Sequence, residues 1–164
     1  MPVYYLETSA LLKKYRPERG TDVVTELFDK KGQLEVFITS YLTVVEIASV
    51  TTRLLRARTI TRRAHNRILG NLSHDTNEAI LLQPISDGVV LEAVILSQRH
   101  AIRAPDAIHL STAMRARATA PSDSFYFLGS DARLNSACRS SGLLVLDPEE
   151  ANSLEALRNL RGHR

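Results

Sequence analysis

Cysteine is almost absent from this chain, and long hydrophobic runs are absent. The single cysteine, Cys138, excludes an intramolecular disulfide and a cysteine metal cluster, and its helix-like surroundings predict a buried apolar side chain rather than a reactive thiol. No apolar run approaches the roughly 20 residues that a membrane-spanning helix needs, and the first residues lack the basic start and apolar core of a secretory signal. We therefore expect a cytoplasmic protein without a membrane partner.

Length and hydrophobic content favour one domain. The chain has 164 residues, of which 44% are hydrophobic, and shows no linker, internal repeat or low-complexity tract. Such a chain can bury one sizeable core and is short for two ordinary domains. We expect residues 1–148 to form the body of the domain, and residues 149–164 to add a C-terminal helix with a frayed basic end.

Short β-rich runs alternate with helical patterns along the sequence. Between the β-rich runs, apolar residues recur every three or four positions, as on the buried face of an amphipathic helix. This alternation is typical of βαβ units, so we predict an α/β fold with three layers (α/β/α) around a central, mostly parallel sheet. About five strands are expected, near residues 3–6, 36–39, 79–83, 125–128 and 143–146.

Acidic residues stand out at four places in this framework. Glu7 ends the first predicted strand and Glu46 lies in an apolar helix, while Asp106 begins a helix and Asp131 follows the fourth strand. Strand ends and helix starts converge on one edge of a parallel sheet, so these side chains could meet in one cleft. Taken singly, Asp106 and Asp131 are better explained as helix caps, whereas Glu46 needs a partner or a metal to offset desolvation.

A group of carboxylates without basic neighbours in sequence indicates a metal site, because divalent cations relieve the mutual repulsion. Oxygen ligands without cysteine or an adjacent histidine favour Mg²⁺ or Mn²⁺ over Zn²⁺. Such an ion can bridge a phosphate and lower the pKa of a bound water, so the pattern favours phosphodiester hydrolysis. The hydroxyls of Thr8, Ser9 and Ser130 could support carboxylates or waters, although capping and turn stabilisation explain each of them equally well.

Four segments of the chain, taken together, resemble a known family. They read Tyr-Leu-Glu-Thr-Ser-Ala-Leu-Leu at 5–12, Thr-Ser-Tyr-Leu-Thr-Val-Val-Glu at 39–46, Arg-Ala-Pro-Asp-Ala-Ile-His-Leu-Ser-Thr-Ala at 103–113, and Leu-Gly-Ser-Asp-Ala-Arg-Leu at 128–134. In this order they are similar to PIN-domain ribonucleases, most of all to the toxins of VapBC-type toxin–antitoxin pairs. The resemblance runs from Val3 to about Pro148 and implies a PIN domain over residues 1–148.

The resemblance implies an endoribonuclease toxin that uses Mg²⁺ or Mn²⁺ to direct water onto an RNA phosphodiester. By motif, the metal-binding and catalytic acids would be Glu7, Glu46, Asp106 and Asp131, with supporting hydroxyls on Thr8 and Ser130. The family usually forms homodimers and is inhibited by a cognate antitoxin that often places a basic side chain in the acidic site. We therefore expect a homodimer, an antitoxin partner and a larger toxin–antitoxin assembly. Basic residues on the rim would contact RNA phosphates, and the candidates are Lys13, Lys14, Arg16 and Arg53.

Glu7 departs from the family pattern, which almost always has Asp at this position. Glutamate is longer by one methylene, roughly 1.5 Å. Mg²⁺ requires near-ideal octahedral oxygens at about 2.0–2.1 Å, so the longer side chain predicts reduced activity and better tolerance of Mn²⁺. The alternative is a catalytically impaired PIN-domain protein that acts through antitoxin or RNA binding.

Two further hypotheses are weaker. A phosphoacceptor or phosphatase domain of another α/β family would need an aspartate nucleophile where this chain has Glu7. His109 lies one helical turn from Asp106 and could approach the site, but we expect it to be a structural residue.

Overall fold

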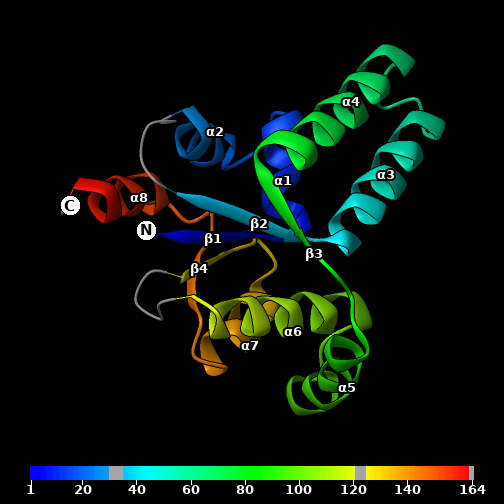
Figure 1. Cartoon of the computed structure of the whole chain (residues 1–164). Helices are drawn as coiled ribbons and strands as arrows, with labels where there is room; N and C mark the ends of the chain where they lie inside the picture. The colour runs from blue at the N-terminus through cyan, green and yellow to red at the C-terminus, as the bar shows by residue number, and fades with distance from the viewer. Residues whose placement is uncertain (30–34, 121–124, 163–164) are drawn as a thin grey trace.

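The computed structural model describes residues 1–29, 35–120 and 125–162, and a five-stranded sheet forms its centre (Figure 1). The order across the sheet is β3-β2-β1-β4-β5, and every neighbouring pair is parallel. The predicted α/β class is confirmed, and the five strands start or end within one residue of the predicted ranges. They are β1 (Val3–Leu6), β2 (Val36–Ser40), β3 (Ile80–Gln83), β4 (Phe125–Leu128) and β5 (Leu144–Leu146).

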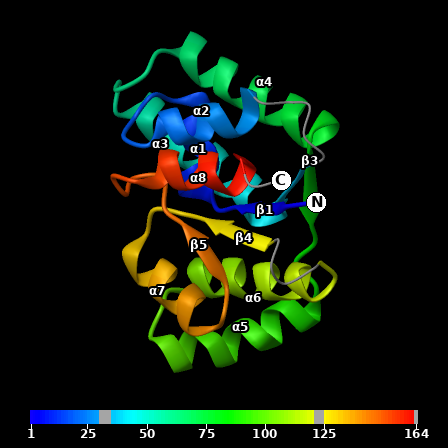
Figure 2. The same cartoon turned by 90° about the vertical axis from the view of Figure 1, so that its left-hand side faces the viewer.

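Helices cover both faces of this sheet, which makes the three layers visible in Figures 1 and 2. One face carries α1 (Thr8–Tyr15), α2 (Thr21–Asp29), α3 (Tyr41–Arg56), α4 (Arg62–Glu78) and α8 (Ser153–Gly162). The other face carries α5 (Asp87–His100), α6 (Ala104–Ala118) and α7 (Ala132–Ser140). Among the helices of the described ranges, none combines the length and hydrophobicity needed to cross a membrane.

Strand β1 lies in the middle of the sheet because all four of its side chains are apolar enough to be buried on both faces. Successive side chains point to opposite faces of a strand. Tyr4 accordingly stacks on Phe37 and Tyr126, whereas Tyr5 stacks on Phe127 in the core on the other side. The central strand is thus held from both layers, and its carboxyl end is a rigid support for the residues that follow.

The C-terminal helix α8 is anchored at Arg161, within the stretch expected from the sequence to be a frayed basic end, and residues 163 and 164 lie outside the described residues. The Arg161 side chain is buried and donates hydrogen bonds to the carbonyl oxygens of Glu26 (2.8 Å) and Leu27 (2.7 Å) near the end of α2. It also forms an ion pair with Glu35 before β2. The last carbonyls of a helix have no partner within that helix, so an arginine that reaches them fastens the two helices together.

The single cysteine matches its prediction. Cys138 lies fully buried in the core beneath α7, and burial raises the pKa of its thiol far above the ordinary value. A protonated, inaccessible thiol is a packing group rather than a nucleophile.

Candidate active site

The parallel strands all end at one edge of the sheet, and three of the predicted acids lie beside it. Glu7 follows β1 directly, and its backbone N–H donates to the carbonyl of Leu128 at the end of β4 (2.9 Å). A cleft of about 440 Å³ opens beside this point, and its lining includes Glu7, Glu46 and Asp106. The structure therefore brings together acids that are up to 99 residues apart in sequence, from Glu7 to Asp106.

Glu7 is buried and is the N-cap residue of α1. Its Oε2 accepts hydrogen bonds from the backbone N–H of Ser9 (2.9 Å) and from the Ser9 hydroxyl. The Ser9 Oγ in turn accepts the N–H of Ser130 (2.9 Å), which ties the end of β1 to the loop after β4. Burial raises the pKa of the Glu7 carboxyl, against the opposing effects of His109 and the bonds from Ser9. The longer acid is accommodated because its side chain turns back onto the helix start.

Glu46 is held in place from two other elements. Its Oε2 accepts the hydroxyl of Thr8 at the start of α1 and lies 2.9 Å from Nε2 of His109 on α6. Burial raises the pKa of this carboxyl, but the hydrogen bonds from His109 and Thr8 and the charge of Arg103 outweigh it, so the pKa lies below the ordinary value. Glu46 therefore has the partners that its apolar surroundings predicted, and the carboxylate is ionised at neutral pH.

His109 belongs to the site, which the sequence argument did not expect. It is only 1% exposed, with Nδ1 2.9 Å from the Tyr5 hydroxyl and Nε2 3.2 Å from the Thr8 hydroxyl. Burial raises the pKa of Tyr5 well above its ordinary value, so this hydroxyl keeps its proton. A carboxylate can only accept, so Nε2 of His109 is the donor in its hydrogen bond with Glu46. The signal in the sequence was the spacing of three from Asp106, which places both on one helix face.

The two aspartates are bound by an arginine that the sequence analysis did not single out for this site. Arg103 donates through Nε to Oδ2 of Asp106 (2.9 Å) and through Nη2 to Oδ1 (3.3 Å), and its Nη2 lies 3.6 Å from Oδ2 of Asp131. Asp131 also caps α7 by accepting the N–H of Leu134 (2.8 Å), as the capping explanation anticipated. Asp106 is not the N-cap of α6, because that position belongs to Arg103.

The carboxylates of the cleft suit a divalent cation. Ligand atoms of Glu7, Glu46 and His109 all lie within 4.8 Å of one another. The nearby Ser130 Oγ is buried without a hydrogen-bond partner in the described part of the chain, which suits a hydroxyl that binds a water or an ion. His109 lies beside the oxygen ligands predicted from the sequence, but its Nε2 is engaged by Oε2 of Glu46 (2.9 Å), so in this arrangement it orients that carboxylate.

Lys13 does not lie on the rim where the sequence analysis placed it. Its side chain is only 2% exposed and forms ion pairs with Glu18 (2.9 Å) and Glu149 (2.7 Å). Burial lowers the pKa of this ammonium, but the two carboxylates outweigh that effect and keep it charged. The Lys13 ammonium, enclosed by two acids, therefore links α1 to the C-terminal segment. It is not available to contact RNA phosphates.

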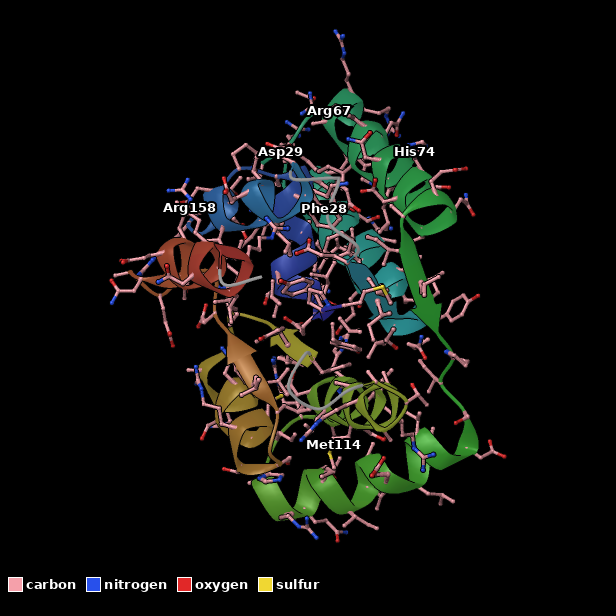
Figure 3. All side chains as sticks on the ribbon, turned by 60° about the vertical axis from the view of Figure 1, so that its left-hand side comes forward. Phe28, Asp29, Arg67, His74, Met114 and Arg158 are labelled. Atoms are coloured by element: carbon pink, nitrogen blue, oxygen red, sulfur yellow. The ribbon has the colours of Figure 1, made fainter. Side chains whose placement is uncertain are left out.

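The other three rim candidates also differ in where they lie. Lys14 pairs with Asp75 on α4, and Arg16 pairs with Glu18. Arg53 lies in the cleft lining together with the acids. Arg67 and His74 mark the exposed side of α4 in Figure 3. Of the predicted rim residues, Arg53 is thus the one best placed to meet a ligand of the cleft.

The fold and the acidic edge define a class of protein, and comparison with known proteins identifies it. The chain belongs to the PIN domain family, which matches residues 4–140. It is 32% identical over 147 residues to Ribonuclease VapC35 of Mycobacterium tuberculosis, in strains CDC 1551 / Oshkosh and H37Rv. This match covers 90% of the chain and 98% of the relative.

Solved structures of low sequence identity share the fold. One such structure is VapBC2 from Rickettsia felis bound to a DNA fragment from the VapBC2 promoter. A chain of it superposes on this protein with a TM-score of 0.63 at 10% identity. That alignment covers 88% of this chain and 98% of that one. A chain of a toxin–antitoxin complex from Klebsiella pneumoniae gives a TM-score of 0.59 at 16% identity, with 90% and 98% covered.

Proposed function

We propose that this protein is a metal-dependent endoribonuclease and the toxin of a VapBC-type toxin–antitoxin pair, acting in the cytoplasm. The observation that carries the proposal is the cluster of Glu7, Glu46 and the buried His109, whose two carboxylates line one cleft together with Asp106. Similarity to a protein named Ribonuclease VapC35 supports the substrate class. The proposed catalytic and metal-binding acids are Glu7, Glu46, Asp106 and Asp131, supported by Thr8, Ser9 and Ser130.

The residues of the cleft divide the proposed work between them. A bound Mg²⁺ or Mn²⁺ would supply a polarised phosphate oxygen and a water of lowered pKa. Glu46 offers a carboxylate whose orientation is set by Thr8 and His109. Glu7 offers a second carboxylate, which Ser9 holds against the start of α1. Arg53, in the lining of the same cleft, supplies a positive charge for the RNA backbone.

The antitoxin and a second copy of this chain are the proposed protein partners. An acidic cleft suits a basic side chain of an antitoxin, because charge-assisted hydrogen bonds to carboxylates are strong.

Helix α5 exposes Val90, Leu91, Val94 and Ile95, and an apolar patch of this kind marks a protein interface. In a two-fold dimer the same patch meets itself, so Val94→Glu should shift a dimer to monomer in sedimentation velocity. A larger toxin–antitoxin assembly would be built from such dimers.

A catalytically impaired protein is the second candidate function, and Glu7 favours it. The carboxylate is engaged through Oε2 in capping α1, so a ligand position and a cap compete for one side chain. A protein with this defect would still fold, bind RNA and pair with its antitoxin.

RNA cleavage with Mg²⁺ or Mn²⁺ tests both candidates, using the unmodified chain, Glu7→Asp and Asp106→Asn, each folded and free of antitoxin. Restoring the shorter acid should raise the rate by up to about a hundredfold, the usual scale for a catalytic group displaced by roughly 1 Å. Asp106→Asn should abolish cleavage. The nuclease proposal fails if Glu7→Asp cuts no better than Asp106→Asn. If the unmodified chain is as fast as Glu7→Asp, attenuation by Glu7 is wrong.

A further inference from the structure

Helix α6 lacks the side-chain cap with which other helices of this chain begin. Arg103 is its N-cap residue and makes no side-chain capping bond. A cation at a helix N-terminus faces the positive end of the helix dipole, and arginine is not among the favoured N-cap residues. A local rule broken in this way is expected at a functional site. Capping side chains begin five other helices, at Glu7, Ser40, Thr61, Ser86 and Asp131.

The Arg103 side chain instead spans two of the proposed metal ligands. It binds both oxygens of Asp106 and approaches Asp131, so one guanidinium partly neutralises two carboxylates. Asp106 is buried, whereas the Arg103 side chain is 72% exposed. An exposed arginine on a flexible stem can swing away without disturbing the core, and its surface ion pairs are individually weak.

We propose that Arg103 is an exchangeable internal cation of this site. It occupies Asp106 and Asp131 until a divalent ion takes these carboxylates, and the released guanidinium then binds an RNA phosphate in the same cleft, whose lining includes Arg103 and Arg53. Planar guanidinium groups bind carboxylate and phosphate with the same two-pronged geometry, so one side chain can serve both states. The inference rests on the proposed function, because it needs Asp106 and Asp131 as ligands.

Calorimetric titration of the antitoxin-free protein with Mn²⁺ tests the first half without any cleavage. Arg103→Gln should bind Mn²⁺ roughly fivefold more tightly, the scale of a charge-assisted but exposed ion pair. Arg133→Gln is the matched control, since Arg133 is an exposed arginine two residues from Asp131 and should leave the affinity within about twofold. In an Asp106→Asn background the gain from Arg103→Gln should disappear. Unchanged or weaker Mn²⁺ binding by Arg103→Gln overturns the exchange and leaves a purely structural ion pair.

Binding of a short RNA at saturating Mn²⁺ tests the second half. Arg103→Gln should weaken RNA binding several-fold, and Arg103→Lys should restore part of it because charge is kept while the two-pronged geometry is lost. Equal RNA affinity of Arg103→Gln and the unmodified protein overturns the phosphate role. If Asp106→Asn leaves Mn²⁺ binding intact, the proposed metal site itself fails. If that site holds and only the Arg103 results fail, the proposed function survives and the exchange does not.

Discussion

Replacing Glu7 by glutamine separates the two tasks that this side chain combines. Glutamine keeps the length of the side chain and an oxygen that can accept the Ser9 N–H and hydroxyl, so the cap of α1 is retained. It removes the negative charge, which is buried beside Glu46. The variant should therefore be more stable than the unmodified chain without metal and less responsive to metal.

The sign follows from the pKa of Glu7, which burial raises above its ordinary value of 4.5. The folded protein holds this proton at pH values where the unfolded chain has lost it, so stability is lost as pH rises through the folded pKa. At neutral pH the burial of this acid costs about 1–2 kcal/mol, on the scale of the usual penalty for a buried polar group. For a domain of this size that is about 2–8 °C in Tm. The advantage of Glu7→Gln should vanish below about pH 4.

Bound Mn²⁺ should reverse the order of stability of the unmodified protein and Glu7→Gln. Mn²⁺ at about 100 times its Kd stabilises a protein by about 2.7 kcal/mol, or roughly 5–11 °C here. If losing the charged ligand weakens binding about a hundredfold, the same Mn²⁺ concentration stabilises Glu7→Gln by only about 0.4 kcal/mol. The unmodified protein should then melt above the variant.

Thermal unfolding by circular dichroism at pH 4 and pH 7, with and without Mn²⁺, measures all these differences. Glu150→Gln is the control, since the Glu150 side chain is exposed and forms an ion pair with the exposed Arg139. Equal Tm values at pH 7 without metal would refute the argument from burial. Equal stabilisation of both proteins by Mn²⁺ would show that Glu7 is not a ligand.

Further predictions concern His109 and the C-terminal helix. His109→Gln should lower Mn²⁺ affinity and cleavage by about 10–100-fold because Glu46 loses its orienting partner, and intact binding in titration would make His109 purely structural. Arg161→Ala should cost about 3–5 kcal/mol in urea unfolding, since it leaves the buried Glu35 carboxylate without its ion-pair partner and with only a long bond from the Tyr4 hydroxyl (3.4 Å). Arg158→Ala, on the exposed side of α8 (Figure 3), should cost less than about 1 kcal/mol, and similar losses for both would contradict the burial argument.

The positions of the acids in the fold were predictable. Each acid follows a strand or lies in a helix, and the hydrophobic patterns that indicate strands and helices are short-range. Glu7 comes straight after four buried apolar residues, and Asp131 comes shortly after β4, so strand prediction alone placed both at one edge. That edge is common to parallel strands, whatever the details of packing. Family resemblance then predicted a PIN domain, and the PIN match over residues 4–140 confirms the family.

The side-chain partners were not predictable, because they depend on how distant helices pack. Lys13 and Lys14 are adjacent and chemically alike, yet Lys13 is enclosed by Glu18 and Glu149 while Lys14 reaches Asp75 on α4. The direction of a helical side chain changes by about 100° per residue, so one position faces the core and the next does not. Counting charges along the sequence therefore cannot distinguish the surroundings of Lys13 from those of Lys14.

The sequence by itself thus determined the sheet and the edge at which the four acids were expected, since hydrophobic patterning and strand order are encoded locally. Only the tertiary structure decided which groups hold those acids. His109 reaches Glu46 across 63 residues of sequence because α3 and α6 meet beside the end of β1. Arg103 covers Asp131 because α6 and α7 pack together on the same face of the sheet. Such contacts exist only after the layers assemble, so they are absent from any local pattern.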